Sequence, residues 1–543
     1  MAYVITQNCC KDASCVPVCP VECIRPIGGP GAFTDTEMLY IEPDVCIDCG
    51  ACEEECPVGA IYSEDQLPPE LERFREINAR YFEHNPLRPD DTGHHNAHSA
   101  VKLGALRVAI VGAGPAGCYA ADELVRIKGV EITMVERLPV PFGLVRFGVA
   151  PDHQHTKGIS GLFAETLNSD RLSCYFNVTV GNDISHDELM AHHHAVIYAV
   201  GASESRELGL PGEELHGHHA AADFVGWYNG HPDHAHRSFD LSGQRAVIIG
   251  NGNVSLDIAR ILLSPNAVLA ETDIAEHALQ ALGDADVREV VILARRGPRQ
   301  AAFSIGEFMA LGQMPDVDVV IEAHDLDPGP ADDIETVIKL EVLREYAQRR
   351  STPGNKRIVF RFFTSPEEVV GDDSAHGLRV TPTKLGAEGA AIPAGDSELI
   401  ETSLILRSTG YLGSRIPGVP FDAVSGTVPN DVGRVLDGNG RPVPGVYVTG
   451  WIKRGPRGVI GTNRTCAEQT VAALWEDFDA GVLASEITDR AALEGLLVSR
   501  DVTPLSWEDW TVIDAAERER GVSSARPRVK FVDVADMLTE VRR

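Results

Sequence analysis

The cysteines are the residues whose types and spacing most directly suggest chemistry. Nine of the 12 cysteines lie within the first 56 residues. Four of them form the run Cys46-x2-Cys49-x2-Cys52-x3-Cys56-Pro57. In such a run, three closely spaced thiolates bind three corners of a cubane iron–sulfur cluster, and the fourth, before the proline, reaches a second cluster. The spacing therefore predicts two clusters in the N-terminal segment.

An earlier run supplies the reciprocal ligands, because Cys15-x3-Cys19-Pro20 repeats the tail of the motif. We expect one [4Fe–4S] cluster to be held by Cys19, Cys46, Cys49 and Cys52. The second cluster would be held by Cys56, Cys15 and Cys9, or by Cys10 in place of Cys9.

The first half of the motif lacks its middle cysteine between Cys9 and Cys15. With three thiolates the second cluster would be [3Fe–4S], and with Cys10 recruited it would be [4Fe–4S]; the sequence leaves both open. Cys23 has no assigned ligand role and is interpreted as a buried structural thiol. Zinc is the competing metal, but zinc sites usually combine two separated C-x2-C pairs rather than a continuous run followed by Cys-Pro.

A glycine-rich loop indicates a dinucleotide site further along the chain. The apolar run 107–111 predicts a buried strand, and Gly112, Gly114 and Gly117 follow it before a helical stretch. Glycines at this spacing let the backbone approach a pyrophosphate at the helix N-terminus. Glu136 ends the next predicted strand, where a carboxylate binds ribose hydroxyls and repels a 2′-phosphate. This first site is predicted to bind FAD or NAD(H) rather than NADP.

A second loop of the same kind follows the apolar run 246–249 and reads Gly250-Asn251-Gly252-Asn253-Val254-Ser255. Ser255 replaces the third glycine and is still small. The next predicted strand ends in Arg295 and Arg296, and two guanidinium groups favour a 2′-phosphate. The opposite charges at the two sites predict FAD at the first and NADP(H) at the second.

No C-x2-C or C-x4-C pair occurs after Cys56. A flavin in this chain would therefore lack the thiol acceptor that disulfide oxidoreductases use. The predicted iron–sulfur clusters are the alternative acceptors, and they take one electron at a time.

Changes in composition and in hydrophobic pattern along the chain divide the 543 residues into several units. We expect a cluster domain at 1–88, closed by a helix within 67–88, and a linker at 89–105. One nucleotide domain is expected at 106–205 together with 416–543, and the other at 206–415.

The charge is strongly acidic, with Lys+Arg 48 against Asp+Glu 80. This balance argues against nucleic acid or an anionic membrane surface as a partner. Without a signal peptide or an apolar run of about 20 residues, a cytoplasmic location is expected.

Several stretches resemble known proteins. Residues 141–153, 223–229, 250–254, 295–303 and 451–463 are similar to signatures of the adrenodoxin-reductase family, and residues 1–88 resemble seven-iron-type bacterial ferredoxins. The whole chain resembles bacterial ferredoxin/ferredoxin–NADP reductase fusions. The resemblance implies an α+β ferredoxin-like iron–sulfur domain followed by two Rossmann-like α/β domains of the glutathione-reductase type.

The resemblance also implies an activity. The chain would be an FAD-dependent ferredoxin–NADP⁺ reductase that takes hydride from NADPH and passes single electrons to iron–sulfur clusters. The electrons would then reach an external ferredoxin or a heme monooxygenase, and the reverse direction would use the same residues.

The resemblance implies roles for particular positions. FAD would be contacted by Ala116, Glu136, Leu144 and Val180. The flavin and nicotinamide would be lined by Trp451, Gly458, Val459 and Ile460. NADP would be bound by Asn251, Gly252, Asn253, Val254, Arg295, Arg296 and Glu307. His153 would lie near the isoalloxazine and exchange protons with solvent. The family usually has a second Glu where this chain has Ala310, which is a departure at any relay built on His153 and Glu307.

Two alternatives remain open. One is an electron-input subunit similar to a glutamate synthase small subunit, although those usually have a longer N-terminal cluster domain, and the match of residues 142–153 argues against it. The other is a non-enzymatic iron–sulfur carrier or redox sensor whose flavoprotein half only binds nucleotides. NADPH-dependent cytochrome c reduction by a protein with stoichiometric FAD would exclude the second.

Overall fold

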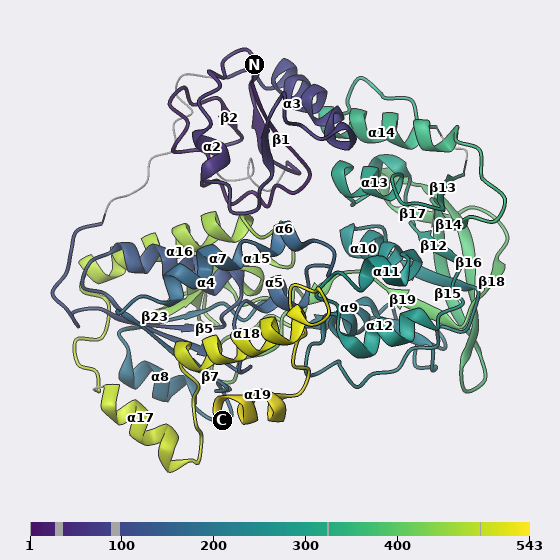
Figure 1. Ribbon diagram of the computed structural model, residues 1–543. Coiled ribbons are helices and arrows are strands. Elements are labelled where there is room, and N and C mark those ends of the chain that lie inside the picture. The colour runs from purple at the N-terminus through teal and green to yellow at the C-terminus, as the bar shows by residue number, and fades with distance from the viewer. Residues whose placement is uncertain (1, 28–35, 88–97, 323–324, 489) are drawn as a thin grey trace.

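The computed structural model describes residues 2–27, 36–87, 98–322, 325–488 and 490–543. An N-terminal part (residues 2–87) lies above two larger units, each built around a sheet of mainly parallel strands (Figure 1). We call these the first and second α/β units. Most of the predicted linker falls at 88–97, outside the described residues, and its described end, 98–105, forms no helix or strand.

The N-terminal part is built from two short antiparallel pairs, β1 with β4 and β2 with β3, and from helix α3. Helix α3 lies within the predicted helical stretch and buries Phe74, Ile77 and Tyr81 at helical spacing. Asn78 on the same helix joins the two pairs, because its Oδ1 accepts from the N–H groups of Ile5 (3.3 Å) and Ile41 (2.9 Å). The elements are β1 (Tyr3–Ile5), β2 (Ile24–Arg25), β3 (Tyr40–Ile41), α2 (Ala51–Glu54), β4 (Ile61–Ser63), η1 (Pro69–Leu71) and α3 (Arg73–His84).

The first α/β unit contains a seven-stranded sheet in the order β21-β22-β23-β8-β5-β6-β7. Strands β23 to β7 of that order are parallel, and β21 and β22 form an antiparallel edge. The strands are β5 (Arg107–Val111), β6 (Glu131–Glu136), β7 (Leu172–Phe176), β8 (Ala195–Tyr198), β21 (Asn430–Asp431), β22 (Arg434–Leu436) and β23 (Pro442–Val448). The helices are α4 (Pro115–Arg126), α5 (Gly143–Phe147), α6 (Gln154–Lys157), α7 (Ser160–Leu167), α8 (His186–His192), α15 (Trp451–Arg454), α16 (Thr462–Asp479), α17 (Arg490–Ser499), α18 (Trp507–Val522) and α19 (Val534–Val541).

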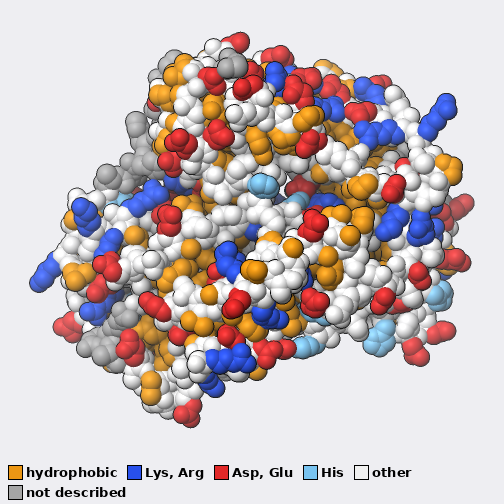
Figure 2. Space-filling model, in the orientation of Figure 1, with side chains coloured by type: hydrophobic (Ala, Val, Ile, Leu, Met, Phe, Trp, Pro, Cys, Tyr) orange, Lys and Arg blue, Asp and Glu red, His pale blue; other side chains and the backbone are white. Residues whose placement is uncertain are grey.

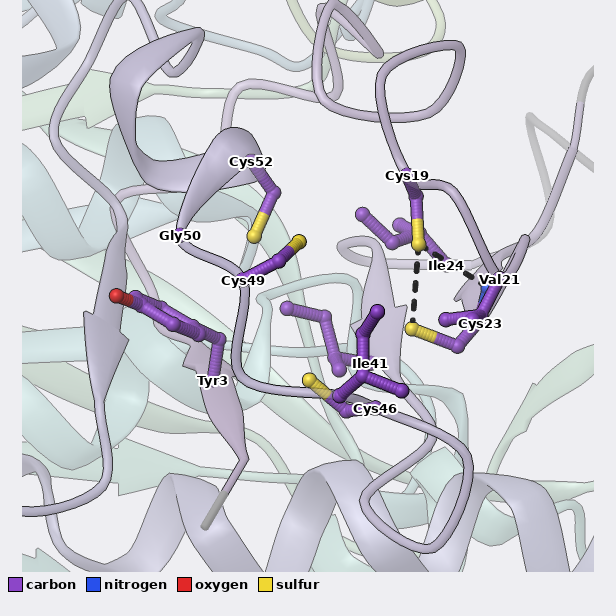
Figure 3. Close-up of a pocket in the computed structure, with 11 residues that line it drawn as sticks. Tyr3, Cys19, Val21, Cys23, Ile24, Ile41, Cys46, Cys49, Gly50 and Cys52 are labelled. Carbon is purple, nitrogen blue, oxygen red and sulfur yellow. Dashed lines mark hydrogen bonds between the residues drawn. The ribbon is translucent and has the colours of Figure 1, made fainter.

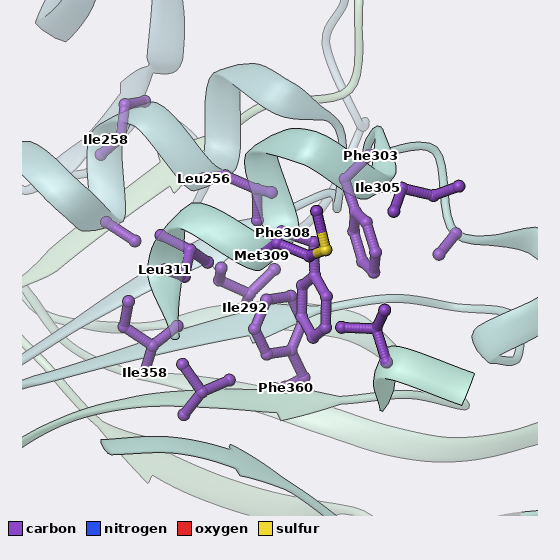
Figure 4. Close-up of a cluster of buried hydrophobic side chains, with 14 of the residues drawn as sticks. Leu256, Ile258, Ile292, Phe303, Ile305, Phe308, Met309, Leu311, Ile358 and Phe360 are labelled. Carbon is purple, nitrogen blue, oxygen red and sulfur yellow. The ribbon is translucent and has the colours of Figure 1, made fainter. Parts of the chain in front are cut away.

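The second α/β unit contains a fully parallel six-stranded sheet in the order β10-β19-β11-β12-β14-β13. Its aromatic and aliphatic core lies between the sheet and helices α10 and α13, with Phe303, Phe308 and Phe360 in ring contact (Figure 4). The strands are β10 (His218–Ala220), β11 (Arg245–Ile249), β12 (Glu289–Leu293), β13 (Val317–Ile321), β14 (Lys356–Arg361) and β19 (Leu404–Arg407). The helices are α9 (Ala221–Asn229), α10 (Asn253–Leu263), α11 (Asn266–Leu269), α12 (Glu276–Gly283), η2 (Pro298–Gln300), α13 (Ile305–Leu311) and α14 (Ile334–Ala347).

An antiparallel sheet that the sequence reading did not anticipate is inserted in the second unit. It consists of β15 (Thr364–Gly371), β16 (Ala375–Leu385), β17 (Ala391–Pro393) and β18 (Glu398–Glu401), with the short turn η3 (Ala387–Gly389). The two units are joined by a ribbon in which β9 (Glu204–Ser205) pairs antiparallel with β20 (Tyr411–Leu412). The domain limits expected at 205/206 and 415/416 lie beside this ribbon.

The N-terminal part contacts the second unit through two ion pairs and a hydrogen bond to residues of α14. Glu37 lies 3.1 Å from the Lys339 ammonium, and the Tyr40 hydroxyl donates to Glu335. Arg80 on α3 pairs with Glu341 on α14 at 2.8 Å. Helices α3 and α14 consequently lie side by side (Figure 1).

A buried charge network joins both units to the C-terminal segment. Asp273 of the second unit lies 2.7 Å from Lys157 on α6 and 2.9 Å from Lys530, which follows α18. The side chains of Asp273 and Lys530 are 4% and 1% exposed. Burial lowers the pKa of both lysines, and the Asp273 carboxylate opposes that shift.

We expect Asp273→Asn to destabilise the protein by about 3–5 kcal/mol, because it leaves two buried ammonium groups without a counter-charge. The exposed Asp233, which pairs with Arg137 at the surface, provides the control; Asp233→Asn should cost about 0–1 kcal/mol. Thermal and denaturant unfolding of the two variants measures the difference. Equal losses would contradict the role assigned to the network.

Candidate redox sites

Four of the predicted cluster ligands converge on one pocket, which we call site A. Cys19, Cys46, Cys49 and Cys52 line it together with Tyr3, Ile24 and Ile41 (Figure 3). Gly50, between two of the cysteines, has a φ of +77°, and a Cβ there would lie 3.1 Å from the Tyr3 hydroxyl. The glycine thus allows the turn that starts α2 and brings Cys49 and Cys52 to the same pocket.

The other predicted ligands line a second pocket, site B. Cys9, Cys15 and Cys56 meet there, and Cys10 lines the same pocket. The backbone N–H of Ala60 points to Cys56 Sγ at 3.2 Å. Asp12 also lines this pocket, although the cysteine motifs do not single it out.

The chemistry of these thiols fits iron–sulfur clusters. Burial raises the pKa of Cys9 to about 11 and that of Cys52 to about 12, so neither would ionise alone at neutral pH. Bound metal ions supply the positive charge that holds such groups as thiolates.

The separation of the sulfurs also discriminates between metals. Among the described residues, no three cysteine sulfurs lie within 4.8 Å of one another. Ligands of one tetrahedral zinc ion would lie about 3.8 Å apart, given a Zn–S distance of about 2.3 Å. The wider spread favours clusters over zinc.

Cys23 was interpreted as a structural thiol, and the structure places it in site A. It is 2% exposed, and its Sγ lies 3.4 Å from Cys19 Sγ. The hydrogen bond from Cys23 lowers the pKa of Cys19 to about 5. The short Cys19-x3-Cys23 spacing was a signal for this contact.

The first glycine loop is closely packed at the carboxyl end of β5. Gly112 has a φ of +105°, and a Cβ on Gly117 would lie 1.9 Å from the Gly112 carbonyl oxygen. The Glu136 carboxylate accepts from the backbone N–H groups of Ala113 and Leu138 at 2.9 and 3.0 Å. These bonds hold the carboxylate beside the loop, where it can bind a ribose.

The other predicted FAD positions differ in how deeply they are buried. Ala116 is buried in the first turn of α4, which Gly114 caps, and packs against Gly450. Leu144 on α5 is 42% exposed, and Val180 is half-buried next to β7.

The second loop has the same geometry at the end of β11. Gly250 has a φ of +119°, and the Ser255 hydroxyl donates to the Gly250 carbonyl at 2.7 Å. Asn253 begins α10, with Asn251, Gly252 and Val254 on either side, and its Oδ1 accepts from the Ser304 N–H at 2.8 Å.

Arg295 and Arg296 stand at the end of β12, on the strand next to β11. Both are exposed, and neither side chain forms a hydrogen bond or ion pair within the ranges that the structure describes. Their guanidinium groups are therefore available for an anion at this edge of the sheet.

The loop 458–461 of the first unit contacts the N-terminal part, and Trp451 precedes this loop in the chain. Trp451 begins α15 and stacks on Tyr411 with ring centroids 5.8 Å apart. Gly458 has a φ of +84°, and the Val459 N–H donates to the Thr462 hydroxyl at 3.1 Å. Ile460 packs in the same core cluster as Cys10.

His153 and Glu307 come from different units and meet at 3.6 Å. Arg260 on α10 lies between them, because its Nη2 donates to His153 Nε2 at 2.8 Å and its Nη1 lies 3.5 Å from Glu307. An arginine only donates, so His153 Nε2 is the acceptor of this hydrogen bond. Burial raises the pKa of Glu307.

Asp257 completes a set of ligand atoms with His153 and Glu307 that could surround a cation. The Arg260 guanidinium already occupies that position, with Nη2 2.7 Å from Asp257. This cluster is therefore an internal ion-pair network at the junction of the two units.

Two family models match the chain. Residues 106–297 match the model described as "Pyridine nucleotide-disulphide oxidoreductase", and residues 39–62 match "4Fe-4S binding domain". Together with the Rossmann-type sheets, these matches define the class of the protein: an iron–sulfur oxidoreductase that uses a pyridine nucleotide.

Relatives match over nearly the full length. A "Probable ferredoxin/ferredoxin--NADP reductase" of Mycobacterium leprae is 45% identical over 99% of this chain and 97% of that protein. One of Mycobacterium tuberculosis (strain H37Rv) is 45% identical over 99% and 94%. The solved structure "Mycobacterium tuberculosis FprA in complex with NADPH" has a TM-score of 0.77 and 43% identity, and covers 81% of this chain and 100% of that chain.

The chain belongs to the ferredoxin/ferredoxin–NADP reductase family. The predicted family, enzyme class and NADPH-dependent oxidoreductase function are confirmed by this match, as are the Rossmann-type sheets. The full-length match favours this family over a glutamate synthase small subunit or a non-enzymatic carrier. No helix within the described ranges is long and apolar enough to cross a bilayer.

Proposed function

We propose that this chain is an NADPH–ferredoxin oxidoreductase whose own N-terminal part is the first electron acceptor. Bound FAD and iron–sulfur clusters would supply the hydride and single-electron chemistry. The contact between loop 458–461 and site B supports this proposal most strongly. The Gly461 N–H donates to the Cys10 carbonyl at 2.8 Å. A Cβ at Gly461 would lie 1.9 Å from the Lys11 carbonyl oxygen, so only glycine permits this approach.

The two cluster sites then form a series. Residues of the N-terminal part line both sites, but the Cys10 carbonyl of site B accepts from Gly461 of the first unit, whereas Cys49 of site A is the exposed cysteine among those described. We therefore place site B next to the flavoprotein units. We place site A at the outlet, by which we mean the surface where electrons would leave the protein. Exposed carboxylates surround site A: Asp44, Asp48, Glu53, Glu54 and Glu55. Acidic side chains are also visible over the N-terminal part in Figure 2.

An external acceptor would dock at this acidic outlet. Acidic surfaces steer partners with a basic patch and raise the rate of encounter. An external ferredoxin or a heme monooxygenase with such a patch is the acceptor we propose. The reverse flow, from reduced ferredoxin to NADP⁺, would use the same sites.

The nucleotides are assigned by charge. FAD is proposed at the first loop, held by Gly112, Gly114, Ala116, Gly117, Glu136, Leu144, Val180, Trp451, Gly458, Val459 and Ile460. NADP(H) is proposed at the second, held by Asn251, Gly252, Asn253, Val254, Arg295, Arg296 and Glu307. The solved structure of Mycobacterium tuberculosis FprA is a complex with NADPH. His153, held by Arg260, is proposed to exchange protons near the flavin.

The finer architecture is part of the same proposal. We propose the glutathione-reductase type of two-domain arrangement, with the division at 206 and 415 next to the β9–β20 ribbon. Site B would hold the second cluster through Cys9, Cys15 and Cys56. The cytoplasmic location remains a prediction from the sequence.

Replacing Cys49 with serine tests the outlet. We expect Cys49→Ser to remove the [4Fe–4S] EPR signal and to reduce transfer to cytochrome c strongly, because site A loses a ligand. NADPH–ferricyanide activity should remain, since the flavoprotein half is unchanged. Cys174, a buried cysteine of β7, provides the control. Cys174→Ser should alter neither the EPR signal nor the transfer to cytochrome c. Loss of ferricyanide activity in Cys49→Ser would show that the two halves are not separable.

A further inference from the structure

Asp12 occupies a position in the first cysteine run that is filled by a cysteine in the second run. The run Cys9-x2-Asp12-x2-Cys15-x3-Cys19-Pro20 has the same spacing as Cys46-x2-Cys49-x2-Cys52-x3-Cys56-Pro57. Asp12 is therefore the counterpart of Cys49 and lines site B. Carboxylates can bind iron, so the spacing alone would make Asp12 a candidate fourth ligand of the second cluster.

The contacts of the side chain give a different role. Asp12 is 3% exposed, and its Oδ2 accepts from the Tyr119 hydroxyl at 2.7 Å. Its Oδ1 accepts from the backbone N–H of Ser14 at 3.1 Å and from the Ser14 hydroxyl. Arg464 donates to the Asp12 carbonyl at 2.9 Å, and its Nη1 lies 3.5 Å from Oδ1. Both carboxylate oxygens are thus occupied by donors and lie next to a cation.

The partners of Asp12 belong to the elements that form the proposed flavin site. Tyr119 lies on α4, which begins at the first glycine loop, and is 1% exposed. Arg464 lies in the first turn of α16, directly after loop 458–461, and its side chain is 10% exposed. A buried carboxylate held by one group from each element fixes site B relative to both.

We propose that Asp12 is a positioning residue and not an iron ligand. It anchors the N-terminal part to the first unit through Tyr119 and Arg464, and it leaves site B with the three thiolates of Cys9, Cys15 and Cys56. The effect on electron entry rests on the proposed function, whereas the ligand set of site B does not.

Three variants test the anchor. Asp12→Asn, Tyr119→Phe and Arg464→Gln are each mixed anaerobically with NADPH in a stopped-flow experiment. We expect cluster reduction to slow by about 10- to 100-fold, since small misplacements of reacting groups have effects of that size. Flavin reduction, recorded in the same trace, reports whether the flavoprotein half is intact. Glu341→Gln is the control, because it removes the ion pair with Arg80 between the N-terminal part and the second unit, away from loop 458–461. It should change neither flavin reduction nor cluster reduction.

Iron content and low-temperature EPR give a readout independent of turnover. We expect Asp12→Asn to keep the wild-type iron count and the wild-type EPR spectrum, because no ligand is lost. Loss of one iron per chain, or conversion from a four-iron to a three-iron spectrum, would overturn the proposal and make Asp12 a ligand. Wild-type rates of cluster reduction in all three variants would refute the anchor. Wild-type clusters that stay oxidised with NADPH would instead refute the proposed function.

Discussion

Replacing Arg295 and Arg296 together with alanine should weaken NADPH binding on the order of 100-fold and leave NADH binding nearly unchanged. Both guanidinium groups are exposed at the end of β12, and within the described ranges neither has a side-chain partner. Two charge-assisted hydrogen bonds to a phosphate at roughly 1.5 kcal/mol each give about 3 kcal/mol, or about 100-fold. Since NADH lacks the 2′-phosphate, it loses nothing from their removal.

Titration of the flavoprotein with each nucleotide, and KM values with ferricyanide as acceptor, measure this discrimination. Arg299→Ala is the matched control, because Arg299 lies in η2, shortly after Arg296 in the chain, but is paired with Asp332. It should not change the ratio of the two affinities. Equal losses of NADPH and NADH in the double variant would contradict the assignment of the second loop to NADP.

Replacing Cys15 with serine should disconnect the flavoprotein from the outlet. Site B includes Cys10, whose carbonyl accepts from the Gly461 N–H of the first unit, whereas site A includes the exposed Cys49. We expect NADPH-driven reduction of site A and of cytochrome c to fall by roughly two orders of magnitude, as for other misplaced reacting groups. Dithionite, which does not depend on the flavin, should still reduce site A.

The control for this variant is Cys23→Ser. Cys23 contacts Cys19 but is not assigned as a ligand, so both clusters should form and both should be reduced by NADPH. EPR after NADPH and after dithionite separates the two variants. Normal reduction of site A by NADPH in Cys15→Ser would mean that electrons bypass site B.

The parts of the site that sequence reasoning predicted are local. Cysteines separated by two or three residues must lie on one loop, and glycines at the end of an apolar strand define a tight turn before a helix. The structure accordingly brings Cys46, Cys49 and Cys52 into one pocket and places Gly112 and Gly250 at equivalent strand ends. The parallel strands could be predicted because their apolar runs are continuous.

The contacts between distant segments could not be predicted in this way. Asp12 and Arg464 are separated by most of the sequence, and no motif or residue spacing predicts that they pair. The network of Asp273 with Lys530 likewise joins segments that are far apart in sequence. Ala310 marked a departure from the family at any relay built on His153 and Glu307, but only the structure shows that Arg260 contacts both residues. The antiparallel sheet at 364–401 was missed because charged residues, Pro and Gly interrupt its strands β15 and β16, which therefore lack the continuous apolar runs of the parallel strands.

The most direct test of the account is the order in which the two clusters are reduced. Anaerobic protein is mixed with NADPH, frozen at successive times and examined by low-temperature EPR. The account predicts that the signal of the oxidised site B disappears before the signal of the reduced site A grows. Growth of the site A signal while site B is still oxidised would contradict the central claim that electrons enter the N-terminal part through site B.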